Sequence, residues 1–192
     1  MGYPQLRVMT DFSFRRGAST ISSLLASAKS KEVPVLAITD LASMSGVLEF
    51  SDYASSKGIQ PIIGCDLNIL NGADINRKDK LNGHVVLLAM NNIGYINICK
   101  ILEHAYTPIT IGTRSSLPVD PFVSIDYLCE HSEGVIILSG VKTNGLGYAL
   151  ATHSEGDDVL QKLLNAFGNR FYIEMCRTIG QTDFEYEVVP FD

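Results

Sequence analysis

An arginine and a methionine stand at alternate positions in the apolar run Leu6–Met9, directly before Thr10 and Asp11. Side chains two residues apart on a strand point to the same face, so we expect Arg7 and Met9 to enter the same space. Two histidines at this spacing would indicate a metal site, because imidazole is a common metal ligand. A guanidinium has no free lone pair and is always charged. The sequence therefore offers a fixed positive charge where a metalloprotein would place ligands.

Other residues that could bind metals or act as nucleophiles are scattered along the chain. The 4 cysteines include no CxxC pair and are not the pattern of a disulfide framework. We interpret Cys65 as a core residue rather than a nucleophile. The histidines are interpreted as ordinary capping, surface or packing residues: His84, His104, His131 and His153.

The composition favours a folded domain that does not bind nucleic acid by itself. Of the 192 residues, 46% are hydrophobic, and the formal net charge is -6. Affinity for a nucleic-acid backbone comes mainly from Lys and Arg, so this charge disfavours it. The N-terminus lacks the apolar core of a signal peptide, and no apolar run approaches the ~20 residues of a membrane helix. We therefore expect a soluble protein of the reducing cytoplasm, with no membrane contact.

Strand and helix patterns alternate along the chain. Helical spacing or capping residues predict helices within 19–33, 43–57, 91–106, 124–131 and 157–168. Apolar runs predict strands at 6–9, 34–39, 59–70, 84–90, 134–140 and 170–175. This alternation predicts an α/β fold with a parallel sheet, either open or closed into a barrel.

The ends of these strands are where a site is expected. In parallel α/β sheets, ligands bind at the carboxyl ends of the strands. Those ends carry Arg7, Met9, Asp11, Asp40, Leu41, Asp66 and the residues 139–142. His84 begins a strand, so we expect it at the opposite end of the barrel.

Five ordered motifs resemble the PHP (polymerase and histidinol phosphatase) domain at the N-terminus of the bacterial DNA polymerase III alpha subunit. "LRVMTDFSFRRGA" is similar to the family's LHxHSxYSLLDGA, and "VLAITDLASMSGVLEF" to ALAxTDHGNLxGxxEF. "GIQPIIGCDLNI" is similar to GIKPIIGCE. "HVVLLAMNNIGYINICKI" and "LCEHSEGVIILSG" resemble the family's NxxGYxNLxKL helix region and LxEHSEGLIxLSGC. The resemblance runs from about Leu6 to Cys176.

The resemblance implies a PHP-type distorted TIM-like (β/α)7 barrel that is longer than this chain. We therefore expect residues 1–192 to form one PHP domain that stops before its last strands. The palm, fingers and thumb of the polymerase would lie outside it. An open sheet edge would then be expected.

The resemblance also implies a degenerate metal site. The family's ligand positions fall on Arg7, Met9, Arg16, Leu41, Asp66, Tyr106 and Val141. Only Asp66 remains a competent ligand, whereas zinc needs three or four donors and a multinuclear phosphoesterase site needs more. We therefore expect no metal and no catalytic residue in this chain.

Arg7 suggests what replaced the metal. Its guanidinium would repel a divalent cation and could pair inside the protein with Asp66, Asp40 or Asp11. The alternative is that Arg7 snorkels to the surface over the barrel mouth.

Three functions follow from these features. The first is an inactive structural and interaction module of a DNA-directed DNA polymerase, a nucleotidyltransferase, in DNA replication. Its partners would be the remainder of the alpha subunit and a proofreading exonuclease subunit, with Mg²⁺ and most DNA contacts in the parent polymerase. The second is a free-standing PHP-type metal-dependent phosphoesterase or 3'-5' exonuclease. The third, a small-molecule-binding α/β protein, fits the ordered motifs poorly.

Overall fold

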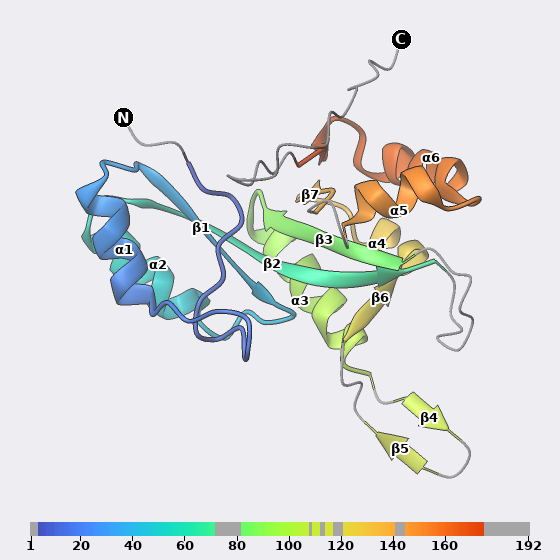
Figure 1. Ribbon diagram of the computed structural model, residues 1–192, viewed down its shortest axis with the longest axis horizontal. Helices are drawn as coiled ribbons and strands as arrows, with labels where there is room; N and C mark the ends of the chain where they lie inside the picture. The colour runs from blue at the N-terminus through green and yellow to red at the C-terminus, as the bar shows by residue number, and fades with distance from the viewer. Residues whose placement is uncertain are drawn as a thin grey trace, which may run out of the picture.

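The computed structural model describes residues 4–71, 82–107, 109–111, 114–116, 121–140 and 145–174 (Figure 1). Within these ranges the protein is a mixed α/β fold built on one twisted sheet, with helices at both ends of it. No helix in these ranges is long and apolar enough to cross a membrane.

The sheet is open and mixed rather than parallel. Its strands lie in the order β1 (Val35–Leu41), β2 (Gln60–Leu70), β3 (Asn82–Ala89), β7 (Val135–Leu138) and β8 (Phe171–Tyr172). A further strand, β6 (Phe122–Ser124), pairs with β2. The strands β1 and β8 lie at the two ends of this order, so the described sheet does not close into a barrel.

The expectation of an all-parallel sheet is wrong at β3. The pairs β1–β2 and β7–β8 are parallel, but β3 is antiparallel to both β2 and β7. A parallel crossover needs a dozen or more residues and usually a helix. Only residues 71–81 separate β2 from β3, fewer than such a crossover usually takes, and β3 pairs with β2 in the antiparallel direction.

The N-terminal segment is not the strand that its alternating pattern predicts. It forms one bridge, Gln5 with Leu36, and the amides of Ala37 and Thr39 donate to the carbonyls of Gln5 and Val8 at 2.9 and 2.8 Å. The amide of Val8 donates to Oγ1 of Thr39 instead of to a backbone carbonyl. A side chain thus replaces a ladder bond, and the segment follows the edge of β1 without becoming a regular strand.

The helices largely follow the sequence patterns. They are α1 (Ile21–Ser30), α2 (Val47–Ser56), α3 (Asn92–Ala105), α4 (Ile125–Glu130), α5 (Leu146–Thr152) and α6 (Gly156–Phe167). The side chain of Thr20 caps α1, and that of Asn91 caps α3. The helix α5 and the small ribbon β4 (Ile109–Ile111) with β5 (Arg114–Ser116) were not predicted from the sequence.

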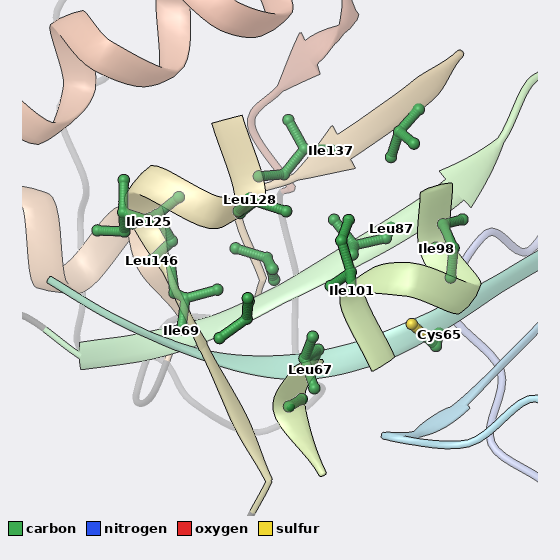
Figure 2. Packing of buried hydrophobic residues seen from close by; sticks show 14 of the residues in the cluster. Cys65, Leu67, Ile69, Leu87, Ile98, Ile101, Ile125, Leu128, Ile137 and Leu146 are labelled. Atoms are coloured by element: carbon green, nitrogen blue, oxygen red, sulfur yellow. The ribbon is translucent and has the colours of Figure 1, made fainter. Parts of the chain in front are cut away.

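Of the three buried clusters that support the sheet among the described residues, two are formed together with the helices. The larger lies between β2, β3 and β7 and the helices α3 to α6, and Figure 2 shows Leu67, Leu87, Ile101 and Leu128 within it. The smaller cluster joins α1 and α2 to β1 around Phe50. Since strand side chains alternate, residues between those of the larger cluster face the other side of the sheet.

Candidate functional site

Asp66 is the buried centre of the candidate site. It lies on β2 between Cys65 and Leu67, whose side chains pack in the larger core cluster, so Asp66 faces the opposite side of the sheet. Its side chain is 0% exposed. A buried carboxylate is costly unless it is paired and hydrogen-bonded. The groups around Asp66 therefore decide what the site can do.

Arg7 supplies the positive charge for this carboxylate. Its Nε and Nη2 donate to Oδ2 of Asp66 at 3.0 and 2.6 Å. The Arg7 side chain is 20% exposed, so the contact is only partly open to solvent. A charge-assisted pair with two donors on one oxygen fixes the guanidinium against the carboxylate.

His84 occupies the second oxygen of Asp66. Its Nδ1 lies 3.1 Å from Oδ1, at hydrogen-bond distance. The expectation that His84 lies at the far end of the barrel is therefore wrong. Because β3 is antiparallel to β2, its first residues lie beside the end of β2, with His84 opposite Asn68.

Glu174 completes the charge cluster from the C-terminal side. Its Oε2 lies 3.9 Å from Nη1 of Arg7, and its backbone amide donates to Oγ of Ser139 at 3.0 Å. In the described part of the chain, this Oε2 is buried without a hydrogen-bond partner. Burial raises the pKa of Glu174, while the Arg7 charge acts in the opposite direction.

Asp40 and Asp11, the other carboxylates considered for Arg7, have different surroundings. Asp40 is buried and accepts hydrogen bonds from the amide and hydroxyl of Thr10 and from Oγ of Ser13, at 2.6, 2.7 and 2.5 Å. Asp11 is exposed, and its amide donates to the carbonyl of Ser19. Asp40 therefore anchors the chain after Met9, and Arg7 contacts Asp66 and Glu174.

Among the remaining ligand-equivalent positions, Leu41 is the register partner of Asp66 on β1, but its apolar side chain offers no ligand. Met9 and Leu41 are half-buried, and Arg16 is exposed. The Tyr106 hydroxyl donates to the carbonyl of Ala42 at 2.9 Å. Val141 lies outside the described residues.

The donor set does not fit a metal centre. No group of three or more His, Cys, Asp or Glu residues that could hold a metal ion occurs in the described ranges. The two oxygens of Asp66 are taken by Arg7 and His84, and Arg7 adds a positive charge. A divalent cation would need more donors and would be repelled by the guanidinium.

The other histidines and Cys65 make stacking, capping and core contacts in the described structure. The ring of Tyr127 stacks between His104 and His131, with centroids 3.9 and 4.2 Å apart. His153 follows the last residue of α5. Cys65 is fully buried, and this burial strongly raises the pKa of its thiol, so it is a poor nucleophile at neutral pH.

Comparison with known proteins decides the family. The family model for the PHP domain matches residues 5–178. The chain belongs to the PHP domain family. The PHP domain is 31% identical over 182 residues to DNA polymerase III subunit alpha of Vibrio cholerae, covering 94% of this chain and 15% of that protein. The same subunit of Caulobacter vibrioides is 32% identical over 179 residues, covering 92% of this chain and 15% of the relative.

Solved structures share the fold of this PHP domain at low sequence identity. A proposed metal-dependent phosphoesterase from Bifidobacterium adolescentis matches with a TM-score of 0.55 and 11% identity, covering 89% of this chain and 76% of that one. An amidohydrolase from Chromobacterium violaceum matches with a TM-score of 0.51 and 12% identity, covering 88% and 75%. These similarities support a PHP-like fold and do not assign a function to any residue of this chain.

Two members of the charge cluster were missed by sequence reasoning. His84 could have been placed from the short connection before β3, which disfavours a parallel crossover. Glu174 stands two residues after β8 and carries no motif. Its position depends on the pairing of β8 with β7, which no local pattern reveals.

Replacing Arg7 with Ala is expected to destabilise the protein strongly. Removing one partner of a buried pair leaves the other charge uncompensated and typically costs about 3–5 kcal/mol. Urea unfolding should show this loss for Arg7→Ala, while Arg15→Ala, on an exposed loop residue, should change the free energy of unfolding little. Equal, small effects of the two variants would contradict the ion pair.

Glu174→Gln is expected to stabilise the protein at neutral pH. The folded-state pKa of Glu174 is raised, so the folded state holds its proton more tightly than the unfolded state. The stability of the wild-type protein should therefore fall as the pH rises through that folded pKa. The amide in Glu174→Gln has no charge to bury, so its stability should not fall in this way. The two proteins should have similar stability below pH 4.5, the ordinary pKa of glutamate.

Thermal melts of both proteins between acid and neutral pH measure this difference. Glu103→Gln, on the exposed side of α3, is the matched control and should shift the melting temperature little at any pH. A melting temperature of Glu174→Gln below that of the wild type at neutral pH would show that the Arg7 contact outweighs the cost of burial.

Proposed function

We propose that this PHP domain is a catalytically inactive structural and interaction module of a replicative DNA polymerase III alpha subunit. The observation that carries the proposal is the guanidinium of Arg7 on Asp66, at 2.6 Å. Asp66 is the one ligand-type residue left at the family's ligand positions, and it is committed to this pair.

The chemistry of the site supports inactivity. A metal-dependent phosphoesterase uses cations to polarise the phosphate and to generate a hydroxide at neutral pH. Here the positive charge is the guanidinium of Arg7. This group stays protonated at neutral pH and does not generate a hydroxide nucleophile. Arg7 therefore offsets the charge of Asp66 without supplying Lewis-acid chemistry.

The size of the relatives supports a role within a longer protein. The chain spans about 15% of the length of the curated relatives it matches. The proposal places nucleotide addition, with Mg²⁺ held by carboxylates, in another part of such a subunit. DNA contacts belong mainly to that part, since this chain has a net charge of -6. The proposed partners are the remainder of the subunit and a proofreading exonuclease subunit.

A second candidate is a free-standing phosphoesterase or 3'-5' exonuclease with a reduced metal set. The fold similarity to a proposed metal-dependent phosphoesterase favours it. Asp66 and His84 also remain as two adjacent donors on one face of the sheet. A metal would have to displace Arg7 to use them.

Metal content and hydrolysis distinguish the two candidates. After incubation with Mn²⁺ or Zn²⁺ and desalting, we expect elemental analysis to find far less than one ion per chain. We also expect no hydrolysis of bis-p-nitrophenyl phosphate or of a labelled single-stranded oligonucleotide.

A stoichiometric metal together with turnover lost in Asp66→Asn would contradict the proposed inactivity. Asp126→Asn is the matched control, because Asp126 is an exposed carboxylate that pairs with Lys162 on the surface. This control should leave any such activity unchanged.

A further inference from the structure

The loop of residues 11–17 displays two phenyl rings and two guanidiniums to solvent. It is the dark-blue segment that precedes α1 in Figure 1. Phe14 is 84% exposed and Phe12 is 42% exposed, while Arg15 and Arg16 are both exposed. Aromatic residues and arginine are the types most enriched at the energetic centres of protein interfaces.

Buried hydrogen bonds hold this loop from beneath. Asp40 accepts from the hydroxyls of Thr10 and Ser13, and Oγ of Ser13 accepts from the amide of Leu41 at 3.0 Å. The amides of Arg16 and Gly17 both donate to the carbonyl of Ser13 at 2.9 Å. The exposed rings therefore project from a fixed base.

The backbone of the loop is strained at Arg15 and tightly packed at Gly17. Arg15 has a φ of 64°, a left-handed conformation that a side chain disfavours. A Cβ at Gly17 would lie 1.8 Å from the carbonyl oxygen of Thr10, so only glycine fits there. A loop that is held in one conformation loses less entropy when a partner binds. Backbone strain such as that at Arg15 is often found at functional positions.

The two arginines are unneutralised cations in an acidic protein. Among the ion pairs of the described residues, none involves Arg15 or Arg16. The guanidinium of Arg15 lies 5.7 Å from the centre of the Phe14 ring, which leaves its N–H groups free for an anionic partner. The net charge of the chain is -6, so this loop differs in sign from the molecule as a whole.

We propose that the 11–17 loop docks an acidic, apolar segment of a partner protein. Carboxylates of that segment pair with Arg15 and Arg16, and its apolar side chains cover Phe12 and Phe14. The ring of Phe12 packs over Gly46, just before α2, so the loop also contacts the start of that helix. The inference rests on the proposed role as an interaction module and names its surface.

A protein segment fits this surface better than nucleic acid does. Binding to a nucleic-acid backbone requires several cations that neutralise successive phosphates. The loop offers two, and the remainder of the chain would repel a polyanion. A short segment with a few carboxylates needs no more than these two guanidiniums.

Fluorescence anisotropy tests the docking surface in the full chain. The probe is a short labelled peptide that alternates acidic residues with Leu and Phe, at low salt. We expect Phe14→Ala and Arg16→Glu each to weaken its binding about tenfold or more, equivalent to about 1.4 kcal/mol. Both residues are exposed, so the variants should retain the wild-type melting temperature.

A second cation–π pair supplies control variants away from the loop. At the end of α2, Nζ of the half-buried Lys57 lies 4.6 Å from the centre of the exposed Tyr53 ring. Tyr53→Ala and Lys57→Glu remove an aromatic ring and reverse a charge, as the two loop variants do. They should leave the affinity for the acidic peptide unchanged.

Three outcomes would overturn the docking surface. The first is that the acidic peptide does not bind, and the second is that the loop and control variants weaken its binding equally. The third is that oligothymidylate binds more tightly than the peptide does, and that this binding depends on Phe14 and Arg16. None of these outcomes involves metal uptake or hydrolysis, so the proposed inactivity would stand. Conversely, metal-dependent turnover by the wild-type chain would contradict the inactivity whatever the peptide binding shows.

Discussion

An ionised carboxylate without solvent contact needs a partner, and in this protein the guanidinium of Arg7 gives Asp66 that partner. Burying both charges adds little net stability, but each group becomes necessary once the other is in place. The pair joins the N-terminal segment to the middle of β2, across a sequence separation of 59 residues. The site is therefore organised around a fixed internal cation where a metalloenzyme would hold exchangeable ones.

The ion pair between Arg7 and Asp66 links parts of the fold that the sheet alone does not connect strongly. The N-terminal segment follows β1 through a few hydrogen bonds, and β8 has only two residues. Arg7 lies on Asp66 and near Glu174, so electrostatics brings the two ends of the described chain to one place. Within the described residues Oε2 of Glu174 has no hydrogen-bond partner, so the cluster is not fully satisfied. Asp40 has the corresponding role for the loop that follows, through Thr10 and Ser13.

Local patterns predicted most of the elements, because capping and periodicity act over a few residues. Thr20 caps α1, Asn91 caps α3, and the unbroken apolar run before Asp40 becomes β1. The direction of β3 and the irregular N-terminal segment depend on pairing between distant residues, so both were predicted wrongly. The same error placed His84 at the wrong end of the sheet. Glu174 could not be predicted, since only the position of β8 brings it to Arg7.

Diffraction from crystals grown with manganese tests the central claim most directly. The account predicts continuous density between the guanidinium of Arg7 and the carboxylate of Asp66. It also predicts no anomalous peak within coordination distance of Asp66 or His84. A manganese peak bound by these two side chains, with Arg7 turned away into solvent, would contradict it.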